Sequence, residues 1–393
     1  MHLSFGNVNS AFAGLVRCMK PGFQGIAAET SRNGPVRYFQ QPVTITFEKP
    51  CQRVLFNTAR DANPFFHVFE ALWMLAGRND LDPLLKYVST FGDFSDDGKT
   101  LNGAYGYRWR KHEGKFNDRL WDTSTGEELH TRDQLDLLVE HLKEFPNSRR
   151  AVLQMWNVED DLLKVNNSLD VCCNLSACFA IRNGPETQTV FAWKDVNKLR
   201  EKYGVEKFNE EQLKELEDTC TDTIQMKTPY LDMTVFNRSN DMVWGTCGAN
   251  AVHFSFLQEY MAKRLGVGVG VYNQISNNLH VYTETNWKPE KWLSEEKKFS
   301  YMQDVKISVP FVLDPETFDK EVKEFIDNND WSRSWKEPFL HRVAAPMMWA
   351  FELHRRRNYL TALQSCNEIE DDAWRISATN WITKRRDKYE SCK

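Results

Sequence analysis

Several features of secreted, metal-binding and membrane proteins are missing from this 393-residue sequence. Its nine cysteines include no CxxC pair and no Cys/His cluster at zinc-finger spacing, which predicts neither a disulfide framework nor a metal site. No apolar run approaches the roughly 20 residues that span a bilayer. Residues 1–20 lack the basic start and the long apolar core of a signal peptide. We therefore expect a soluble cytoplasmic protein with free thiols and no membrane contact.

An excess of positive charge is also missing. The net charge of -5 and the pI near 6.0 argue against broad electrostatic binding to nucleic acid. They still allow a local basic pocket for one phosphate. The hydrophobic fraction of 41% and the charged fraction of 27% are those of a globular protein, and an aromatic fraction of 13% can fill a large core. Without internal repeats or low-complexity linkers, one elaborated domain is expected rather than two.

The most informative stretch covers residues 231–265. Its first part, Met233 to Phe236, is β-branched and apolar and predicts a strand. Four polar side chains follow, and then two glycines lead into a helix with one apolar face. This order is common in anion and ligand sites, although it also fits a polar connection between two core elements. The four polar residues are Arg238, Ser239, Asn240 and Asp241.

A second segment predicts a helix that is buried on most sides. Asn63 can cap it, Pro64 suits its first turn and Gly77 ends it. Nearly every other position is large and apolar, so the carboxylate of Glu70 needs a partner, because burying an unpaired charge is costly. Glu70 either has a functional role or forms a salt bridge with Arg78 or another base.

Other segments predict further helices, strands and loops. An amphipathic helix is expected over residues 134–145 and a strand over residues 151–156, with Arg149-Arg150 between them. Two adjacent arginines are usually a solvated edge, but they also make a bidentate phosphate clamp. Residues 91–110 indicate a loop, and the charged stretch 183–230 indicates a helical insertion on the surface.

Eight short segments occur in the order found in the thymidylate synthase family, and the sequence resembles that family over roughly residues 30 to 285. Each segment alone is a weak match, and their common order carries the resemblance. The segments are Ser31-Arg32-Asn33-Gly34, Glu70 to Gly77, Tyr105 to Arg110, Ser148-Arg149-Arg150, Trp156-Asn157, the cysteine at 172 or 173, Arg238-Ser239-Asn240-Asp241 and His280-Val281-Tyr282.

The resemblance implies an α/β (α+β) fold with a large mixed sheet flanked by helices. We expect a thymidylate synthase-like catalytic core over residues 1–290. The resemblance does not cover two inserts in this core, at about 111–133 and 183–230. Residues 291–393 would form a C-terminal extension packed on the core.

The resemblance also implies covalent catalysis on a pyrimidine nucleotide. A cysteine thiolate adds at C6, and C5 then attacks the methylene of 5,10-methylenetetrahydrofolate, the implied co-substrate. Arg238 is the candidate that favours the thiolate. The family has Pro-Cys where this chain has Cys172-Cys173, so placing Cys172 at the proline position makes Cys173 the nucleophile. This register also puts Phe179 at an aromatic position of the family's strand. Cys172 as nucleophile, or two buried strand cysteines, are the alternatives.

Further roles follow from the same resemblance. Glu70 would organise water and relay protons at the pyrimidine O4 edge, Tyr105 would assist proton removal at C5, and Asp241 would face the folate. The remaining contacts would come from Arg32, Arg238, Ser239, Arg149 and Arg150 to the phosphate and from His280 and Tyr282 to the ribose. In the family the arginine pair comes from the partner subunit, so a homodimer with shared active sites is implied.

Two departures from the family favour addition of water over reductive methylation. Phe91 occupies the position of the tryptophan that shields the exocyclic methylene on C5, on the folate side of the site. The chain also ends without the short apolar tail that closes over the folate. Poorer closure admits more water. A hydroxymethylated product is therefore expected, and a methylated product is the alternative if another group shields the methylene.

The choice of base depends on one amide. An amide can both donate and accept, which matches O4 and N3–H of uracil. Asn250 is the available amide, although it lies one residue beyond the usual spacing, and Asn240, Asn277 and Asn278 are also near in sequence. We expect dUMP as substrate, with dCMP as the runner-up. A catalytically idle relative that binds a nucleotide or another protein is the alternative of a different class. By resemblance only, a phage enzyme in bacterial cytoplasm is expected.

Overall fold

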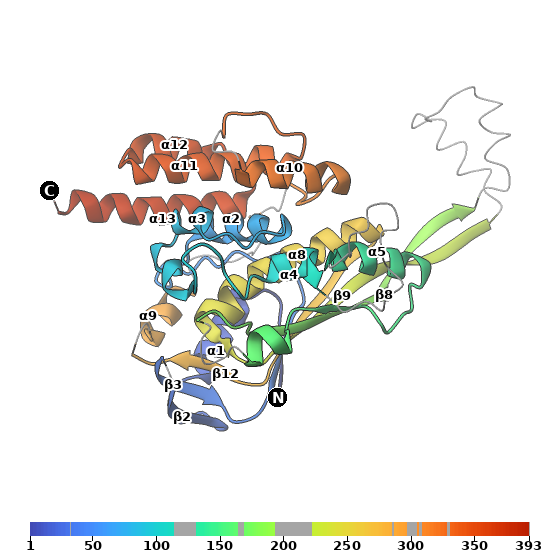
Figure 1. The fold of residues 1–393 in the computed structure, drawn as a ribbon, viewed down its shortest axis with the longest axis horizontal. Helices are drawn as coiled ribbons and strands as arrows, with labels where there is room; N and C mark the ends of the chain where they lie inside the picture. Colours follow the sequence, from blue (N-terminus) through green and yellow to red (C-terminus); the bar gives the residue numbers. More distant parts are fainter. Residues whose placement is uncertain are drawn as a thin grey trace.

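The computed structural model places helices around a central sheet, with a second, smaller sheet below it (Figure 1). This mixed arrangement agrees with the expected fold class. The residues that the structure describes are 1–31, 33–113, 131–163, 169–192, 222–284, 287–296, 305, 309–327 and 331–392.

In the described part of the chain, six strands form the central sheet in the order β1–β4–β11–β9–β8–β7. β1 pairs with β4 and β9 with β11 in parallel, and the other neighbours are antiparallel, so the sheet is mixed as predicted. Its strands are β1 (His2–Phe5), β4 (Val43–Phe47), β7 (Val152–Gln154), β8 (Asn174–Ala192), β9 (Asp222–Asn237) and β11 (Gly268–Ser276).

β8 and β9 correct the expectation of a helical insertion over 183–230. The described ends of that stretch continue the antiparallel pairing outward, and both strands project from the body of the protein (Figure 1). A register shift between Asn183 and Thr187 accommodates the Gly-Pro step that would otherwise interrupt the ladder. The middle of the stretch, residues 193–221, lies outside the described residues.

The second sheet has the order β10–β12–β3–β2 and carries several predicted site residues. β10 and β12 are parallel and set Asp241 opposite His280. The strands are β2 (Ile26–Ser31), β3 (Gly34–Phe39), β10 (Asn240–Asp241) and β12 (Leu279–Tyr282).

Two core helices, α2 (Pro64–Leu75) and α8 (Asn250–Leu265), pack against each other, and α8 also lies on the central sheet. The Asn63 side chain accepts a hydrogen bond from the Phe66 backbone N–H at 3.2 Å, which confirms the predicted cap of α2. α8 ends at Gly266, whose φ of 71° suits glycine. α1 (Val8–Cys18) contacts β1, and α5 (Gln134–Glu144) contacts α8 and β7; α5 is where the sequence predicts it.

The expectation of a loop over 91–110 is wrong at both ends of that segment. It begins within η1 (Ser89–Phe94), which follows α3 (Asp82–Leu85), and it ends with α4 (Tyr105–Arg110). Gly106 explains the error, because a Cβ there would lie 2.0 Å from the Met74 carbonyl oxygen. The glycine allows α4 to approach α2 closely and does not mark a turn.

C-terminal helices cover the outer side of α2 and α3 (Figure 1). Phe351 of α11 packs against Phe65 and Tyr87 with ring centroids 5.4 and 4.6 Å apart, and Trp381 of α13 also contacts Phe65. The boundary drawn at residue 290 stays a prediction. The helical segments here are α9 (Pro289–Ser294), α10 (Pro315–Asp327), η4 (Leu340–Ala344), α11 (Ala345–Arg355), α12 (Tyr359–Asn367) and α13 (Asp372–Glu390).

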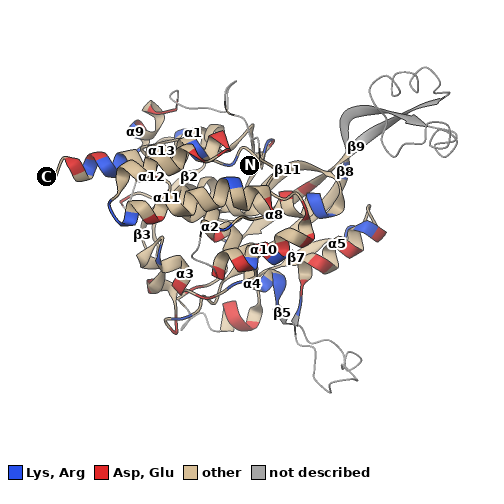
Figure 2. Ribbon diagram, turned by 90° about the horizontal axis from the view of Figure 1, so that it is seen from above, with Lys and Arg blue, Asp and Glu red and all other residues tan. Residues whose placement is uncertain are grey.

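Charge is spread over the protein, with basic and acidic residues interspersed along the described helices (Figure 2). No helix among the described residues is long and apolar enough to cross a membrane. The same residues contain no group of three or more His, Cys, Asp or Glu side chains placed to hold a metal ion.

Candidate active site

Cys173 lies directly before β8, partly exposed, between α4 and the end of β9. Its Sγ is 3.7 Å from Arg238 Nη2, and its backbone N–H donates to the Tyr105 hydroxyl at 3.2 Å. Arg238 itself is held by donating to the Cys172 and Val171 carbonyl oxygens at 2.7 and 3.1 Å. A guanidinium fixed beside a partly exposed sulfur favours the thiolate form of that sulfur.

The side chain of Cys172, unlike that of Cys173, is buried. It is 1% exposed, and its Sγ lies 3.6 Å from the Gly103 carbonyl oxygen and 3.8 Å from that of Met155. Burial raises the pKa of this thiol well above its ordinary value. A buried thiol that stays protonated is a poor nucleophile, so the geometry favours Cys173 over its neighbour.

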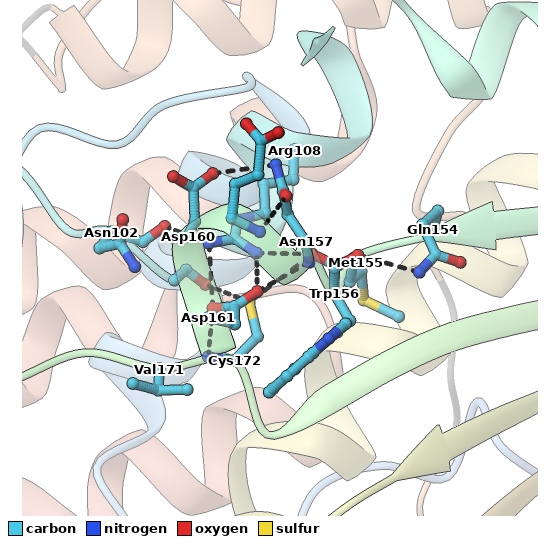
Figure 3. Close-up of polar contacts among 12 residues, drawn as sticks. Asn102, Arg108, Gln154, Met155, Trp156, Asn157, Asp160, Asp161, Val171 and Cys172 are labelled. Carbon is cyan, nitrogen blue, oxygen red and sulfur yellow. Dashed lines mark hydrogen bonds and ion pairs between the residues drawn. The ribbon is translucent and has the colours of Figure 1, made fainter. Parts of the chain in front are cut away.

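A buried ion pair holds the backbone that leads to the two cysteines (Figure 3). Asp161, in the π-helical η2 (Val158–Leu163), is fully buried and accepts from the Cys172 backbone N–H at 3.2 Å and from the Asn157 N–H at 2.8 Å. Its carboxylate contacts Arg108 Nη1 at 2.5 Å, and the same nitrogen donates to the Met155 carbonyl oxygen. Arg108 and Asp161 thus hold the backbone at Met155, Asn157 and Cys172 together, next to the candidate nucleophile Cys173.

Glu70 projects from α2 and keeps 13% of its side chain exposed. Its Oε2 lies 3.1 Å from Nε2 of His253 in α8. Burial, and secondarily the charge of Asp170, raise the pKa of Glu70 to about 8. Arg78 pairs with Asp80 and Asp327 and not with Glu70, so the proposed structural salt bridge between them does not form.

Tyr105 and Asp170 also belong to the candidate site around Cys173 and Glu70. Burial, followed by the charges of Cys173 and Cys172, raises the pKa of Tyr105 well above its ordinary value, so its phenol stays neutral. Asp170 accepts from the Gly103 N–H at 2.7 Å, and burial also raises the pKa of its carboxyl. The site therefore combines a thiol next to a cation with two carboxyl groups of raised pKa, and Glu70, with a pKa of about 8, holds a proton near neutral pH.

The stretch from Asp241 to Asn250 joins the second sheet to α8. Asp241 Oδ1 accepts from the Val243 and Trp244 N–H groups and caps the π-helical η3 (Met242–Ala249). Burial is the main cause that raises the pKa of Asp241. A π-helix has a wider turn than an α-helix, and Gly248 is non-helical, so η3 can take up the extra residue before Asn250.

Asn250 begins α8, and its Nδ2 donates to Asn240 Oδ1 at 3.1 Å. The Asn240 amide in turn donates to Gln274 and Ser276 in β11, so it is tied to the central sheet. Asn278 Oδ1 lies 3.0 Å from His280 Nδ1. These contacts do not single out one of the amides, so Asn250 as the residue for base recognition remains a prediction.

A model of the thymidylate synthase family matches residues 29–325. The chain belongs to the thymidylate synthase family. It is 34% identical over 384 residues to a deoxyuridylate hydroxymethyltransferase of Pseudomonas phage M6, covering 94% of this chain and 91% of that protein. It is 36% identical over 246 residues to a protein of the same name from Bacillus phage SP01, covering 62% of this chain and 50% of that protein. A thymidylate synthase of Wigglesworthia glossinidia brevipalpis is 32% identical over 118 residues, 30% of this chain and 39% of that protein.

The remaining predicted residues of this thymidylate synthase family member lie at three places. The rings of His280 and Tyr282 on β12 are 5.2 Å apart, and Ser239 directly precedes β10, the strand that pairs with β12. Arg149-Arg150 is exposed in the turn between α5 and β7. Phe91, in η1, packs against Phe66 of α2. Arg32 lies outside the described residues.

Sequence reasoning did not find His253, Asp161, Arg108 or Asp170 as parts of the site. Arg108 stood within a matched family segment, and Asp161 and Asp170 stood in the irregular polar stretch before the cysteines. Their functions depend on partners that are distant in the sequence, so no local pattern distinguishes them. His253 was not among the apolar face residues predicted for its helix, and no local pattern marks it as a neighbour of Glu70.

Proposed function

We propose that this protein transfers a one-carbon unit to C5 of dUMP, using 5,10-methylenetetrahydrofolate and water to form 5-hydroxymethyl-dUMP. The observation that carries the proposal is Cys173 beside the Arg238 guanidinium, in one site with the buried Glu70. Together these groups provide a nucleophile, a cation that favours its thiolate and a general acid and base. The name of the phage M6 relative, which matches nearly the whole chain, supports the substrate and the product.

In the proposed mechanism, Cys173 Sγ forms a bond to C6 of the pyrimidine, and electron density becomes available at C5. Arg238 favours the attacking thiolate. The neutral Tyr105 phenol assists proton removal from C5. Glu70 exchanges protons with water at the O4 edge, a role that suits a carboxyl group with a pKa of about 8.

Bound 5,10-methylenetetrahydrofolate would supply the one-carbon unit, and two features near Asp241 fit a folate. Asp241 Oδ2 is buried and has no hydrogen-bond partner within the described ranges, so it can accept from an N–H donor of the folate. The Trp244 ring is 52% exposed and lies over the Arg60 guanidinium at 4.2 Å, which offers a flat apolar surface next to that acceptor.

Addition of water rather than hydride is supported by Phe91. Its phenyl ring covers less area than the indole that the family carries at this position, and it packs against Phe66 and Phe94. A smaller shield leaves more room for water at the exocyclic carbon. For the base, the Asn250 amide supports uracil, because it can both donate and accept.

Tritium release tests this proposal directly. Incubation with methylenetetrahydrofolate should release tritium from [5-3H]dUMP and not from [5-3H]dCMP, and the product mass should be that of the hydroxymethylated nucleotide. Dihydrofolate absorbance should not appear, since it accompanies methylation. Release from neither nucleotide would contradict the enzyme assignment, and release from dCMP alone would contradict the base assignment.

The shared-site homodimer belongs to the same proposal. Arg149 and Arg150 are exposed in the single chain, and neither forms an ion pair with a carboxylate among the described residues. Both are therefore available to bind the phosphate in a second subunit. The phage origin of the relatives supports action in the cytoplasm of a bacterial host.

A further inference from the structure

The contact between Glu70 and His253 determines how the site holds a proton. Glu70 Oε2 and His253 Nε2 are 3.1 Å apart, and His253 is 6% exposed. Both atoms are buried and lie within hydrogen-bonding distance, although neither forms a hydrogen bond with its counterpart or with any other described residue. Buried polar atoms are nearly always paired, so the two atoms should share a proton in a hydrogen bond.

The hydrogen bond between His253 and the His67 backbone indicates which of the two residues supplies that proton. His253 forms a hydrogen bond with the His67 backbone, and this bond raises the histidine pKa, as donation to a carbonyl oxygen does. Because Nε2 has no such partner, the bond is made by Nδ1. In the neutral ring the other nitrogen is then an acceptor, so Glu70 must be the donor.

The surroundings favour this neutral arrangement over a charged pair. Burial lowers the pKa of His253 well below its ordinary value, with His67 as the second cause, and burial raises the pKa of Glu70. The charged and titratable groups that face the pair are Asp170, which raises the pKa of Glu70 further, and His67, whose ring centroid is 6.4 Å from that of His253. Burial, and secondarily the charge of Arg60, lower the pKa of His67 and keep that ring neutral.

We propose that His253 is a positioning residue whose Nε2 lone pair keeps Glu70 protonated at rest and makes its carboxylate a strong base once that proton has been given up. This inference rests on the proposed function. An ionised Glu70 faces a lone pair and not a donor, so the pair regains stability by taking a proton.

The water-addition step uses this property. The water oxygen forms a bond to the exocyclic carbon on C5, one water proton moves to Glu70, and the π electrons move onto O4. When these electrons return, the C5–C6 double bond forms again and the bond between C6 and Cys173 Sγ breaks, with the electron pair leaving on sulfur. Glu70 gives up its proton to water earlier in the turnover and regains one here, so the proton count at Glu70 balances.

The test is a titration of the full-length protein, with a kinetic profile beside it. 13C NMR of labelled glutamate carboxyls, assigned with Glu70→Gln, should give a pKa near 8 for Glu70 in the wild type. In His253→Gln the amide can donate to the carboxylate, so the pKa should fall by at least about one pH unit. The pH profile of tritium release from [5-3H]dUMP should shift in the same direction. His341→Gln, an exposed histidine in the C-terminal layer, is the matched control and should change neither.

An unchanged Glu70 titration in His253→Gln would overturn the inference. If that variant does not fold, His253→Ser leaves room for a water that donates to the carboxylate, and the same fall is expected. Absence of tritium release by the wild type would instead refute the proposed function, while the NMR titration would still decide the role of His253.

Discussion

Replacing Glu70 with Gln should stabilise the protein, and the gain should grow with pH. The carboxyl has a pKa of about 8 in the folded protein against an ordinary value of 4.5. The folded state therefore binds more protons than the unfolded state between these values, and the stability contributed by this group falls as the pH rises. Gln has nearly the same shape, never ionises, and can donate to His253 Nε2 as the protonated carboxyl does.

The size of the effect follows from the two pKa values. At a pH above both, ionising Glu70 costs the folded state about 5 kcal/mol, and the cost grows by about 4 kcal/mol between pH 5 and pH 9. At pH 5 the wild type and Glu70→Gln should differ by less than about 1 kcal/mol from this cause. At pH 9 the variant should be more stable by several kcal/mol, although its turnover should be lost.

Urea unfolding at pH 5 and pH 9, at one protein concentration, measures both free energies of unfolding. Other titrating groups cancel in the difference between wild type and variant. Glu316→Gln is the control, because Glu316 is exposed and water solvates its carboxylate in both states. If the free energies of unfolding of wild type and Glu70→Gln differ by the same amount at the two pH values, the claim that Glu70 is a buried, protonated carboxyl is refuted.

Three other outcomes are expected. Cys173→Ser should lower turnover by about a thousandfold or more, while Cys172→Ser should keep it within about tenfold, measured by tritium release; the opposite pattern would make Cys172 the nucleophile. Arg150→Ala and Cys173→Ser subunits, each inactive alone, should recover about a quarter of wild-type activity when mixed if the active sites are shared between subunits. No recovery would mean that Arg150 acts in the active site of its own subunit or in neither active site. Phe351→Ala should cost about 3–5 kcal/mol in urea unfolding, since its ring fills the contact between α11 and α2; a cost near that of Trp349→Ala, an exposed position, would show that the C-terminal layer does not support the core.

The sequence was most informative where a local pattern and its end signals agree. α2 combines a capping Asn63, an apolar body and Gly77, and the structure has this helix as predicted. The wrong secondary-structure predictions arose at a glycine and in a charged stretch. Gly106 suggested a loop where α4 needs a close approach to α2, and the charged stretch after β8 suggested a helix where strand pairing continues. Such contacts are made by distant segments, which no local pattern records.

The residues of the candidate site divide in the same way, into those that a local pattern reveals and those that only the fold reveals. The residues for which we propose a direct chemical role stood in recognisable short segments, so Cys173, Glu70 and Tyr105 could be named from the sequence. Their supports could not, because Asp161 acts through a backbone N–H and His253 through a carboxyl on another helix. A polar residue in a polar stretch, or one histidine in a helix, has no distinguishing pattern until the fold supplies its partner.

The wide turn of η3 has a consequence for aligning this protein with its relatives. Asp241 fixes one end of the segment through its cap and Asn250 fixes the other through its contact with Asn240, so a length change between them stays local. An alignment without a gap in residues 242–249 would pair Ala249 with the family's base-reading amide and suggest that the chain has lost it. Placing a one-residue gap there pairs Asn250 with that amide instead, so a mutational test of the proposed base recognition should change Asn250 and not Ala249.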